Sequence, residues 1–305
     1  MDFEFTAEQE ELRASVRRFL TERAPLSYVR AVYDDTTGST PEVWTGLRDL
    51  GLLDSGLTMT DIGVVLEEMG RAVYPGPYLS TLAARWAGIE DDSVVATVAL
   101  DRRCVPDATA ADAVVVIEGD ALYVVDDFDV VPVATVDGSR KVGAVTVNKL
   151  GRKIPGSDLR AAADRWMIGY AVDGVGAASV ALEMAVAYSH ERVQFDRPIG
   201  SFQAVQHLCA DMLTALELGR AGAYYALWAA DNESPDEVHR AALMAIAYAS
   251  DAFHRIGADA IQVFGGVGYT WEHDIHLFYK RLLTLQHAFG TAPTHLDDLA
   301  ATVMR

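Results

Sequence analysis

Apolar side chains recur at helical spacing in the first ninety residues. From residue 12 to residue 20 they return every three or four positions, which is the period of one helix face. Residues 6–9 precede this run with the order of a capping box, a signal for a helix start. Two similar runs cover residues 43–53 and 62–71, each with a glycine near its end. This pattern predicts an N-terminal helical domain over residues 1–90.

A different pattern begins near residue 93. Short runs rich in Val, Ala and Thr are separated by turn residues such as Gly and Asp, and runs of this kind predict β-strands. The five predicted strands are residues 94–100, 113–117, 121–125, 130–134 and 144–147. We therefore expect a small, reduced β-domain over residues 91–157.

The rest of the chain returns to helical spacing. Its long apolar-faced stretches are residues 159–190, 201–231, 235–264 and 273–289. Long helices joined by short loops are typical of a bundle, which we expect over residues 158–305. Together the three segments predict an α+β fold that is mostly α.

Composition restricts the partners of the chain. Half of its 305 residues are hydrophobic, enough for a sizeable core. The formal net charge of -19 disfavours nucleic acid and anionic membranes as partners. No apolar run reaches the roughly 18 residues that cross a bilayer, and the acidic N-terminus lacks the pattern of a signal peptide. We expect a cytoplasmic protein in which any anionic cofactor is bound by local arginines or helix N-termini.

Two segments of the C-terminal half carry recognisable chemistry. The first is Arg192-Val-Gln-Phe-Asp-Arg-Pro-Ile-Gly-Ser-Phe-Gln203, with a cation, an amide and an aromatic ring within four residues. The second is Gln262-Val-Phe-Gly-Gly-Val-Gly-Tyr269, whose glycine pair allows close approach to the backbone because no Cβ is present. As an ordered pair they resemble the flavin-binding segments of the acyl-CoA dehydrogenase family. Helices, strands and a bundle follow one another in that family too, so the resemblance covers essentially the whole chain.

The resemblance implies that this chain contacts FAD held mainly by a neighbouring subunit. In the family, the Arg-x-x-Phe segment reaches the flavin pyrophosphate, and an arginine suits this task because its planar fork binds phosphate oxygens in pairs. The Gln-x-x-Gly-Gly loop approaches the same cofactor across the subunit interface, and a Gly-Thr pair contacts flavin near the active site. The matching cofactor-binding residues are Arg192, Gln194, Phe195, Gln203, Gln262, Gly265, Gly266 and Thr291.

The catalytic base that the family uses has no obvious counterpart. A carboxylate must take a proton from the alpha carbon of the acyl-CoA thioester while a hydride leaves the beta carbon for the flavin. Many members carry a glutamate directly before the Gly-Thr pair, where this chain has Phe289. A second subgroup carries it on the first bundle helix, at or near the position of Trp166. Asp164 and Asp173 flank that position and are candidate bases, and Glu272 is a further candidate by location.

A metal site is not expected. His273 and His276 form a His-x-x-His pair, but the sequence supplies no further converging ligands for it. A similar Trp-Glu-His run also follows the glycine loop in the family.

The predicted β-domain departs from the family pattern. The Thr-Glu-Pro-x-Ala-Gly-Ser-Asp segment and the Trp-Ile-Thr-like strand, which hold the flavin ring in the family, are both missing. The chain therefore lacks the parts that hold the ring and abstract the proton, but it keeps the parts that reach a neighbour's flavin. This combination resembles the short, degenerate subunit of heterotetrameric acyl-CoA dehydrogenases from actinobacterial steroid breakdown.

The resemblance implies an FAD-dependent oxidoreductase that desaturates an acyl-CoA thioester, bulky or steroid-derived. It would work as a heterotetramer with a full-length acyl-CoA dehydrogenase subunit and pass electrons to electron-transfer flavoprotein. Two alternatives stay open: a self-sufficient homodimeric dehydrogenase with a relocated carboxylate base, and a flavin-free acyl-binding or scaffold subunit.

Overall fold

The computed structural model describes residues 5–91 and 93–304. The N-terminal helices that the apolar spacing predicts are present. They are α1 (Ala7–Arg23), α3 (Pro41–Asp49) and α4 (Met59–Arg71). Two further short helices, α2 (Leu26–Ala31) and α5 (Tyr78–Trp86), were not predicted. The capping box is confirmed as well. The Thr6 hydroxyl accepts a hydrogen bond from the Gln9 N–H, and the Gln9 side chain accepts one from the Thr6 N–H.

The middle segment forms two small sheets. Their strands are β1 (Ala96–Ala99), β2 (Val105–Pro106), β3 (Ala113–Glu118), β4 (Ala121–Val125), β5 (Phe128–Pro132), β6 (Val142–Val147) and β7 (Arg152–Ile154). One sheet has the order β1-β3-β4-β7, and the other has the order β2-β6-β5. The five predicted strands are confirmed to within two residues at each end. β2 and β7 were not predicted, because runs of two or three residues are too short to show a periodicity.

The remaining chain is helical apart from one hairpin. Its elements are α6 (Leu159–Glu191), β8 (Val193–Gln194), β9 (Arg197–Pro198), α7 (Gln203–Asn232), α8 (Pro235–Phe264), α9 (Ile275–Leu285) and α10 (Ala292–Val303). The last predicted stretch is shorter than expected, since α9 ends at Leu285. The chain then turns at Gly290, whose φ is 124°, and α10 begins. The prediction of an α+β fold that is mostly α is confirmed.

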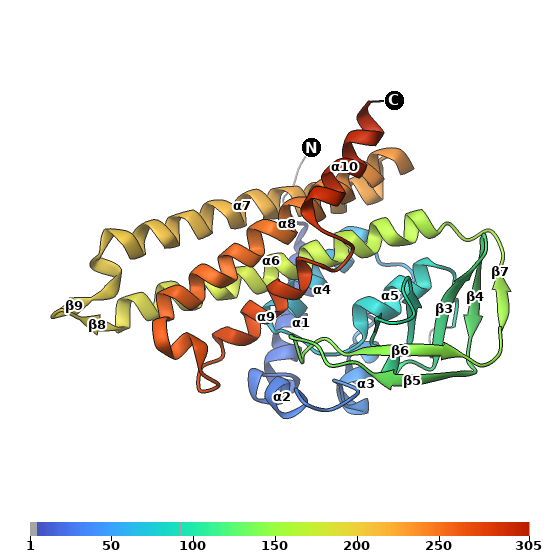
Figure 1. The fold of residues 1–305 in the computed structure, drawn as a ribbon, viewed down its shortest axis with the longest axis horizontal. Coiled ribbons are helices and arrows are strands. Elements are labelled where there is room, and N and C mark those ends of the chain that lie inside the picture. Colours follow the sequence, from blue (N-terminus) through green and yellow to red (C-terminus); the bar gives the residue numbers. More distant parts are fainter. Residues whose placement is uncertain (1–4, 92, 305) are drawn as a thin grey trace.

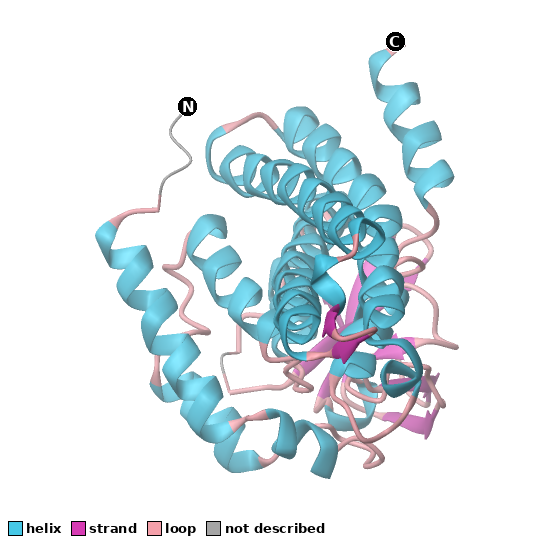
Figure 2. Ribbon diagram, turned by 90° about the vertical axis from the view of Figure 1, so that its left-hand side faces the viewer, coloured by secondary structure: helices cyan, strands magenta, loops and turns pink. Residues whose placement is uncertain are grey.

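Helix α6 runs through the middle of the molecule. It packs against α7, α8 and α9 of the bundle and against α4 and α5 of the N-terminal part. Figure 1 shows the two sheets near the start of α6 and the β8–β9 hairpin near its end. Figure 2 looks at that end, with the hairpin in front of the bundle helices. The two ends of α6 therefore lie beside different parts of the structure.

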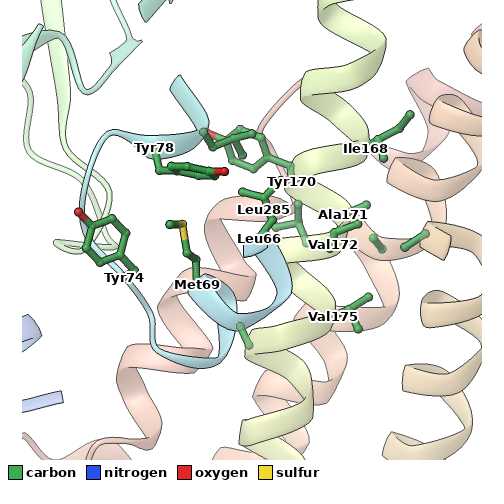
Figure 3. Close-up of a cluster of buried hydrophobic side chains, with 14 of the residues drawn as sticks. Leu66, Met69, Tyr74, Tyr78, Ile168, Tyr170, Ala171, Val172, Val175 and Leu285 are labelled. Carbon is green, nitrogen blue, oxygen red and sulfur yellow. The ribbon is translucent and has the colours of Figure 1, made fainter. Parts of the chain in front are cut away.

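The crossing of α4 and α6 brings their backbones into contact. A Cβ added at Gly70 would lie 1.9 Å from the carbonyl oxygen of Asp173, and one at Gly176 would lie 2.0 Å from that of Glu67. Beside this crossing, side chains of α4, α6 and α9 meet in a common core (Figure 3). By length and composition α6 could cross a membrane, but 72% of its most apolar window is buried inside the protein. This burial fits a core helix.

Candidate functional site

The predicted site residues fall into two groups. Most lie where α6, the β8–β9 hairpin, the start of α7 and the end of α8 come together; we call this group the bundle-end site. It comprises Arg192, Gln194, Phe195, Gln203, Gln262, Gly265 and Gly266. The second group, which we call the aromatic cluster, comprises Trp166 and Phe289, the two positions where the family carries its base, together with Tyr170, which was not predicted. Trp166 and Arg192 are separated by about 39 Å along α6, at 1.5 Å per helical residue.

The hairpin of the bundle-end site is a rigid projection. Phe195 and Asp196 have φ values of 53° and 60°, and positive φ at both central residues is typical of a two-residue hairpin turn whose twist matches that of the flanking strands. The Arg197 guanidinium lies 4.0 Å from the ring centroid of Phe202, and the Phe195 ring meets the same ring at 6.0 Å. Phe195 itself is 87% exposed. The hairpin thus presents an aromatic side chain to the surroundings of the chain.

Arg192 stands at the base of this hairpin. Its backbone carbonyl accepts the Ile199 N–H at 2.8 Å, which closes the hairpin. Its guanidinium is exposed and makes no ion pair or hydrogen bond with any other residue that the structure describes. Close by, α7 begins without a side-chain cap, so its first N–H groups and its helix dipole also face outward. An unpaired guanidinium beside an uncapped helix start is suited to an anion.

The glycine loop lies beside this arginine. Phe264, at the end of α8, stacks on Tyr188 of α6 with 4.3 Å between ring centroids, and Tyr188 is one turn before Arg192. Gly265 has a φ of 61°, and a Cβ added at Gly265 or Gly266 would meet no atom within 4 Å. The backbone of this loop is therefore open to close approach from outside.

The glutamines of the group have exposed side chains. Gln203 opens α7 and Gln262 lies in the last turn of α8, and neither side chain bonds to another described residue. Gln194 donates to the carbonyl of Val193 at 2.7 Å. Their amides are available to a ligand.

Thr291 is not part of the bundle-end site. It precedes α10, is exposed, and its hydroxyl lies 3.1 Å from the Thr294 hydroxyl. Its sequence neighbour Phe289 packs near the start of α6. The Gly-Thr pair and Arg192 are thus on different sides of the molecule.

The two positions where a base is expected meet in space. The ring of Phe289 contacts that of Trp166 at 5.2 Å and that of Tyr170 at 5.4 Å, both edge to face. Trp166 and Tyr170 are buried, and burial raises the pKa of the Tyr170 hydroxyl. Three rings therefore occupy the place where the sequence comparison expects a carboxylate.

Asp173 lies on the same side of α6 but is fully engaged. Arg281 donates two hydrogen bonds to its carboxylate, at 2.9 and 2.8 Å, and Arg140 donates a third at 2.8 Å. Burial by itself would raise the pKa of Asp173, but the two guanidiniums lower it overall. A buried carboxylate held by two cations is a weak proton acceptor.

The other candidate carboxylates point elsewhere. Asp164 is buried and lies 2.7 Å from Nδ1 of His239 on α8, and burial raises its pKa. Its position on α6 is two residues from Trp166, so the two side chains leave the helix in different directions. Glu272 is exposed and forms no hydrogen bond or ion pair with another described residue.

The histidines after the glycine loop lie in an aromatic setting. His276 is 7% exposed, and burial lowers its pKa to about 4. His273 stacks on Phe264 at 4.3 Å. Over residues 5–91 and 93–304, no three His, Cys, Asp or Glu side chains are grouped to hold a metal ion.

The buried ion network around Asp173 was not predicted from the sequence. Arg140, Asp173 and Arg281 come from three distant segments, and Arg140 also stacks on Tyr170 with 4.6 Å to the ring centroid. The only local signal was the spacing of Trp166, Tyr170 and Asp173, which places them on one face of α6.

Comparison with known proteins gives consistent matches. The family described as acyl-CoA dehydrogenase, C-terminal domain, matches residues 162–304. Acyl-CoA dehydrogenase IpdE2 of Mycolicibacterium smegmatis is 31% identical over 322 aligned residues, covering 97% of this chain and 99% of that protein.

Two solved structures share the fold over nearly the full length. A variant of the Tcur3481-Tcur3483 steroid ACAD superposes with a TM-score of 0.89 at 26% identity, covering 97% of this chain and 98% of that chain. The ChsE4-ChsE5 complex of Mycobacterium tuberculosis gives a TM-score of 0.89 at 23% identity, covering 100% and 99%.

Proposed function

This chain belongs to the acyl-CoA dehydrogenase family, and from this premise we propose that it is the subunit that completes the flavin site of a heteromeric, FAD-dependent acyl-CoA dehydrogenase. In this proposal the chain does not abstract the substrate proton. A full-length acyl-CoA dehydrogenase subunit supplies the base and the strands that hold the flavin ring.

The contact between Phe289 and Trp166 carries the proposal. General base catalysis needs a group that accepts a proton within hydrogen-bond reach of the reacting carbon, and neither ring can do so. The two positions come from alternative arrangements in the family, yet here they lie 5.2 Å apart and fill one space. The candidate Asp173 is neutralised by Arg140 and Arg281. A working base in this chain would have to lie outside the usual place.

The donors of the bundle-end site fit FAD. The Arg192 guanidinium and the uncapped start of α7 can bind pyrophosphate oxygens. Gly265 and Gly266 leave room beside the backbone, and Phe195 can contact a cofactor or the partner. When bound, FAD accepts the hydride that leaves the beta carbon of the acyl-CoA. These residues would hold the phosphate part of the cofactor, while the ring would lie on the partner.

The relatives support the choice of partner and substrate. Two structures of similar fold each pair two named chains, Tcur3481 with Tcur3483 and ChsE4 with ChsE5, and the first is described as a steroid ACAD. By analogy we infer a heterotetramer with a full-length subunit, a bulky or steroid-derived acyl-CoA as substrate, and electron-transfer flavoprotein as electron acceptor. The location would be the cytoplasm.

Co-expression tests the proposal. The chain is purified alone and again with a co-expressed full-length acyl-CoA dehydrogenase subunit, and bound flavin and acyl-CoA dehydrogenase activity are measured in both preparations. We expect flavin and activity only in the complex, with activity lost when the partner's base is replaced.

Each other result selects an alternative. Stoichiometric flavin with activity in the chain alone would support the self-sufficient homodimer, and substitution of Asp164, Asp173 or Glu272 by alanine would then identify its base. A stable complex without flavin would support an acyl-binding or scaffold subunit.

A further inference from the structure

Trp271 is an exposed ring held in a fixed position. Its side chain is 59% exposed, although its inner side is packed by three neighbours. The ring meets Tyr33 at 5.5 Å and His276 at 4.5 Å, both edge to face, and the Lys280 ammonium lies 4.1 Å from its centroid. A tryptophan ring that is packed on its neighbours and partly open to solvent is suited to binding a ligand or partner, since tryptophan is enriched at interfaces.

One cation without an ion-pair partner among the described residues lies beside this ring. The Lys280 ammonium lies 4.1 Å from the ring centroid of Trp271 and 5.3 Å from that of Tyr33, and it forms no ion pair with any residue in 5–91 and 93–304. His276 is buried, and neither ring nitrogen has a hydrogen-bond partner among the described residues. Asp34 and Asp137 act on Lys280 only from a distance, and the acidic neighbour Glu272 is exposed. An exposed ring next to an unpaired cation suits a planar group that carries phosphate.

Trp271 is also connected to the bundle-end site. It follows the glycine loop by five residues, counted from Gly266. Phe264, at the start of that loop, stacks on Tyr188 on one side and contacts His273 at 4.3 Å on the other. The same aromatic contacts therefore link the helix end that carries Arg192 to the segment that carries Trp271.

We propose that Trp271 is a stacking platform for the adenine ring of a nucleotide, with Lys280 fixing the indole from behind. This inference rests on the proposed function, because the nucleotide is one that the assembled dehydrogenase binds. Two molecules in the reaction carry an adenine nucleotide, FAD and the CoA part of the substrate. Both present the same chemistry to Trp271, a flat base joined to phosphates.

The test compares Trp271→Ala and Trp271→Phe in the complex with the full-length subunit. After the flavin is removed, rebinding of FAD and of FMN, which has no adenine, is titrated by flavin fluorescence. The Michaelis constant is measured for an acyl-CoA and for the corresponding acyl-pantetheine, which also lacks adenine. Thermal unfolding confirms that each variant is folded.

If adenine belongs to FAD, Trp271→Ala weakens FAD binding by about tenfold, as expected for loss of one base–aromatic stack, and leaves FMN binding unchanged. If adenine belongs to CoA, the same variant raises the Michaelis constant for acyl-CoA by a similar factor and leaves that for acyl-pantetheine unchanged. In both cases Trp271→Phe keeps most of the affinity that Trp271→Ala loses, because phenylalanine retains an aromatic ring.

Unchanged constants for all four ligands would overturn the inference, as would equal changes for ligands with and without adenine. Arg192→Ala, measured in parallel, separates this failure from that of the proposed function. If Arg192→Ala weakens FAD binding while Trp271→Ala changes neither FAD binding nor the Michaelis constant for acyl-CoA, only the adenine platform is refuted. If neither variant affects FAD or substrate, the proposed flavin-completing role fails as well.

Discussion

The two ends of α6 differ in almost every physical respect. At its end, the bundle-end site is exposed, with an unpaired guanidinium at Arg192 and an 87% exposed ring at Phe195. Near its start, the aromatic cluster is packed ring against ring and adjoins an ion network in which Asp173 is fully bonded. The first region has unpaired polar groups at the surface, whereas the second pairs its charged groups internally and leaves only the buried Trp166 Nε1–H without a partner among the described residues of the aromatic cluster. In the proposed function, the first region binds the cofactor or the partner and the second contributes to folding stability.

The largest expected effect concerns the ion network beside the aromatic cluster. Asp173→Asn should lower the free energy of unfolding by about 3 to 5 kcal/mol, because Arg140 and Arg281 would be left buried without their shared counter-charge. Urea unfolding of the purified protein measures it. The matched control is Asp251→Asn on α8, whose exposed ion pair with Arg255 is worth no more than about 0.5 kcal/mol.

The same variant also distinguishes a structural carboxylate from a catalytic one. A stable Asp173→Asn protein whose dehydrogenase activity is abolished would contradict the comparison, because Asp173 would then act as a base rather than as a counter-ion. A destabilised protein that keeps the activity of the remaining folded complex would support it.

The next largest effect on stability is expected from Phe289→Ala, which is compared with Phe195→Ala. Phe289→Ala should lower the free energy of unfolding by about 2 kcal/mol, since its partly buried ring packs on Trp166 and Tyr170. Flavin content of the complex should not change. Phe195→Ala should instead lower the flavin content, because in the proposed function this ring contacts the cofactor or the partner. It should change the free energy of unfolding by no more than about 0.5 kcal/mol, because the side chain is exposed. Thermal unfolding and flavin content, measured on both variants, test these two expectations. Flavin loss in Phe289→Ala would indicate that the aromatic cluster still serves a cofactor.

Local pattern was sufficient to predict much of the fold. The helix start at Thr6 follows from its capping box, and β4 was predicted with its observed ends because alternation and turn residues are properties of adjacent positions. The segment with Arg192 and Phe195 was recognised from its motif for the same reason, although the β8–β9 hairpin that it forms was not predicted. What these predictions share is that their physical cause lies within a few residues.

Other features depend on contacts between distant segments. Asp173 was predicted only as a candidate base, and its ion pair with Arg281 was not foreseen because the two residues are 108 positions apart in the sequence. The contact of Trp166 with Phe289 joins α6 to the chain before α10 and could not be derived from either segment alone. Thr291 was grouped with Arg192 by cofactor chemistry, although the fold separates them. Residue type indicated what these side chains could bind, and only the packing showed whether they are free to do so.

The smallest expected effect concerns the bundle-end site. Arg192→Ala should weaken flavin binding to the complex by about tenfold, or roughly 1.4 kcal/mol, because a charge-assisted phosphate contact at an exposed site is lost. The stability of the chain itself should hardly change, since the guanidinium has no partner among the described residues. Arg192→Lys should recover part of the affinity, because lysine keeps the charge but not the paired geometry. Arg103→Ala, which removes an equally exposed arginine from the β-sheet region, serves as the control. Equal flavin loss in both arginine variants would mean that net charge, rather than the position of Arg192 at the end of α6, governs binding. The bundle-end site would then no longer differ from the rest of the surface.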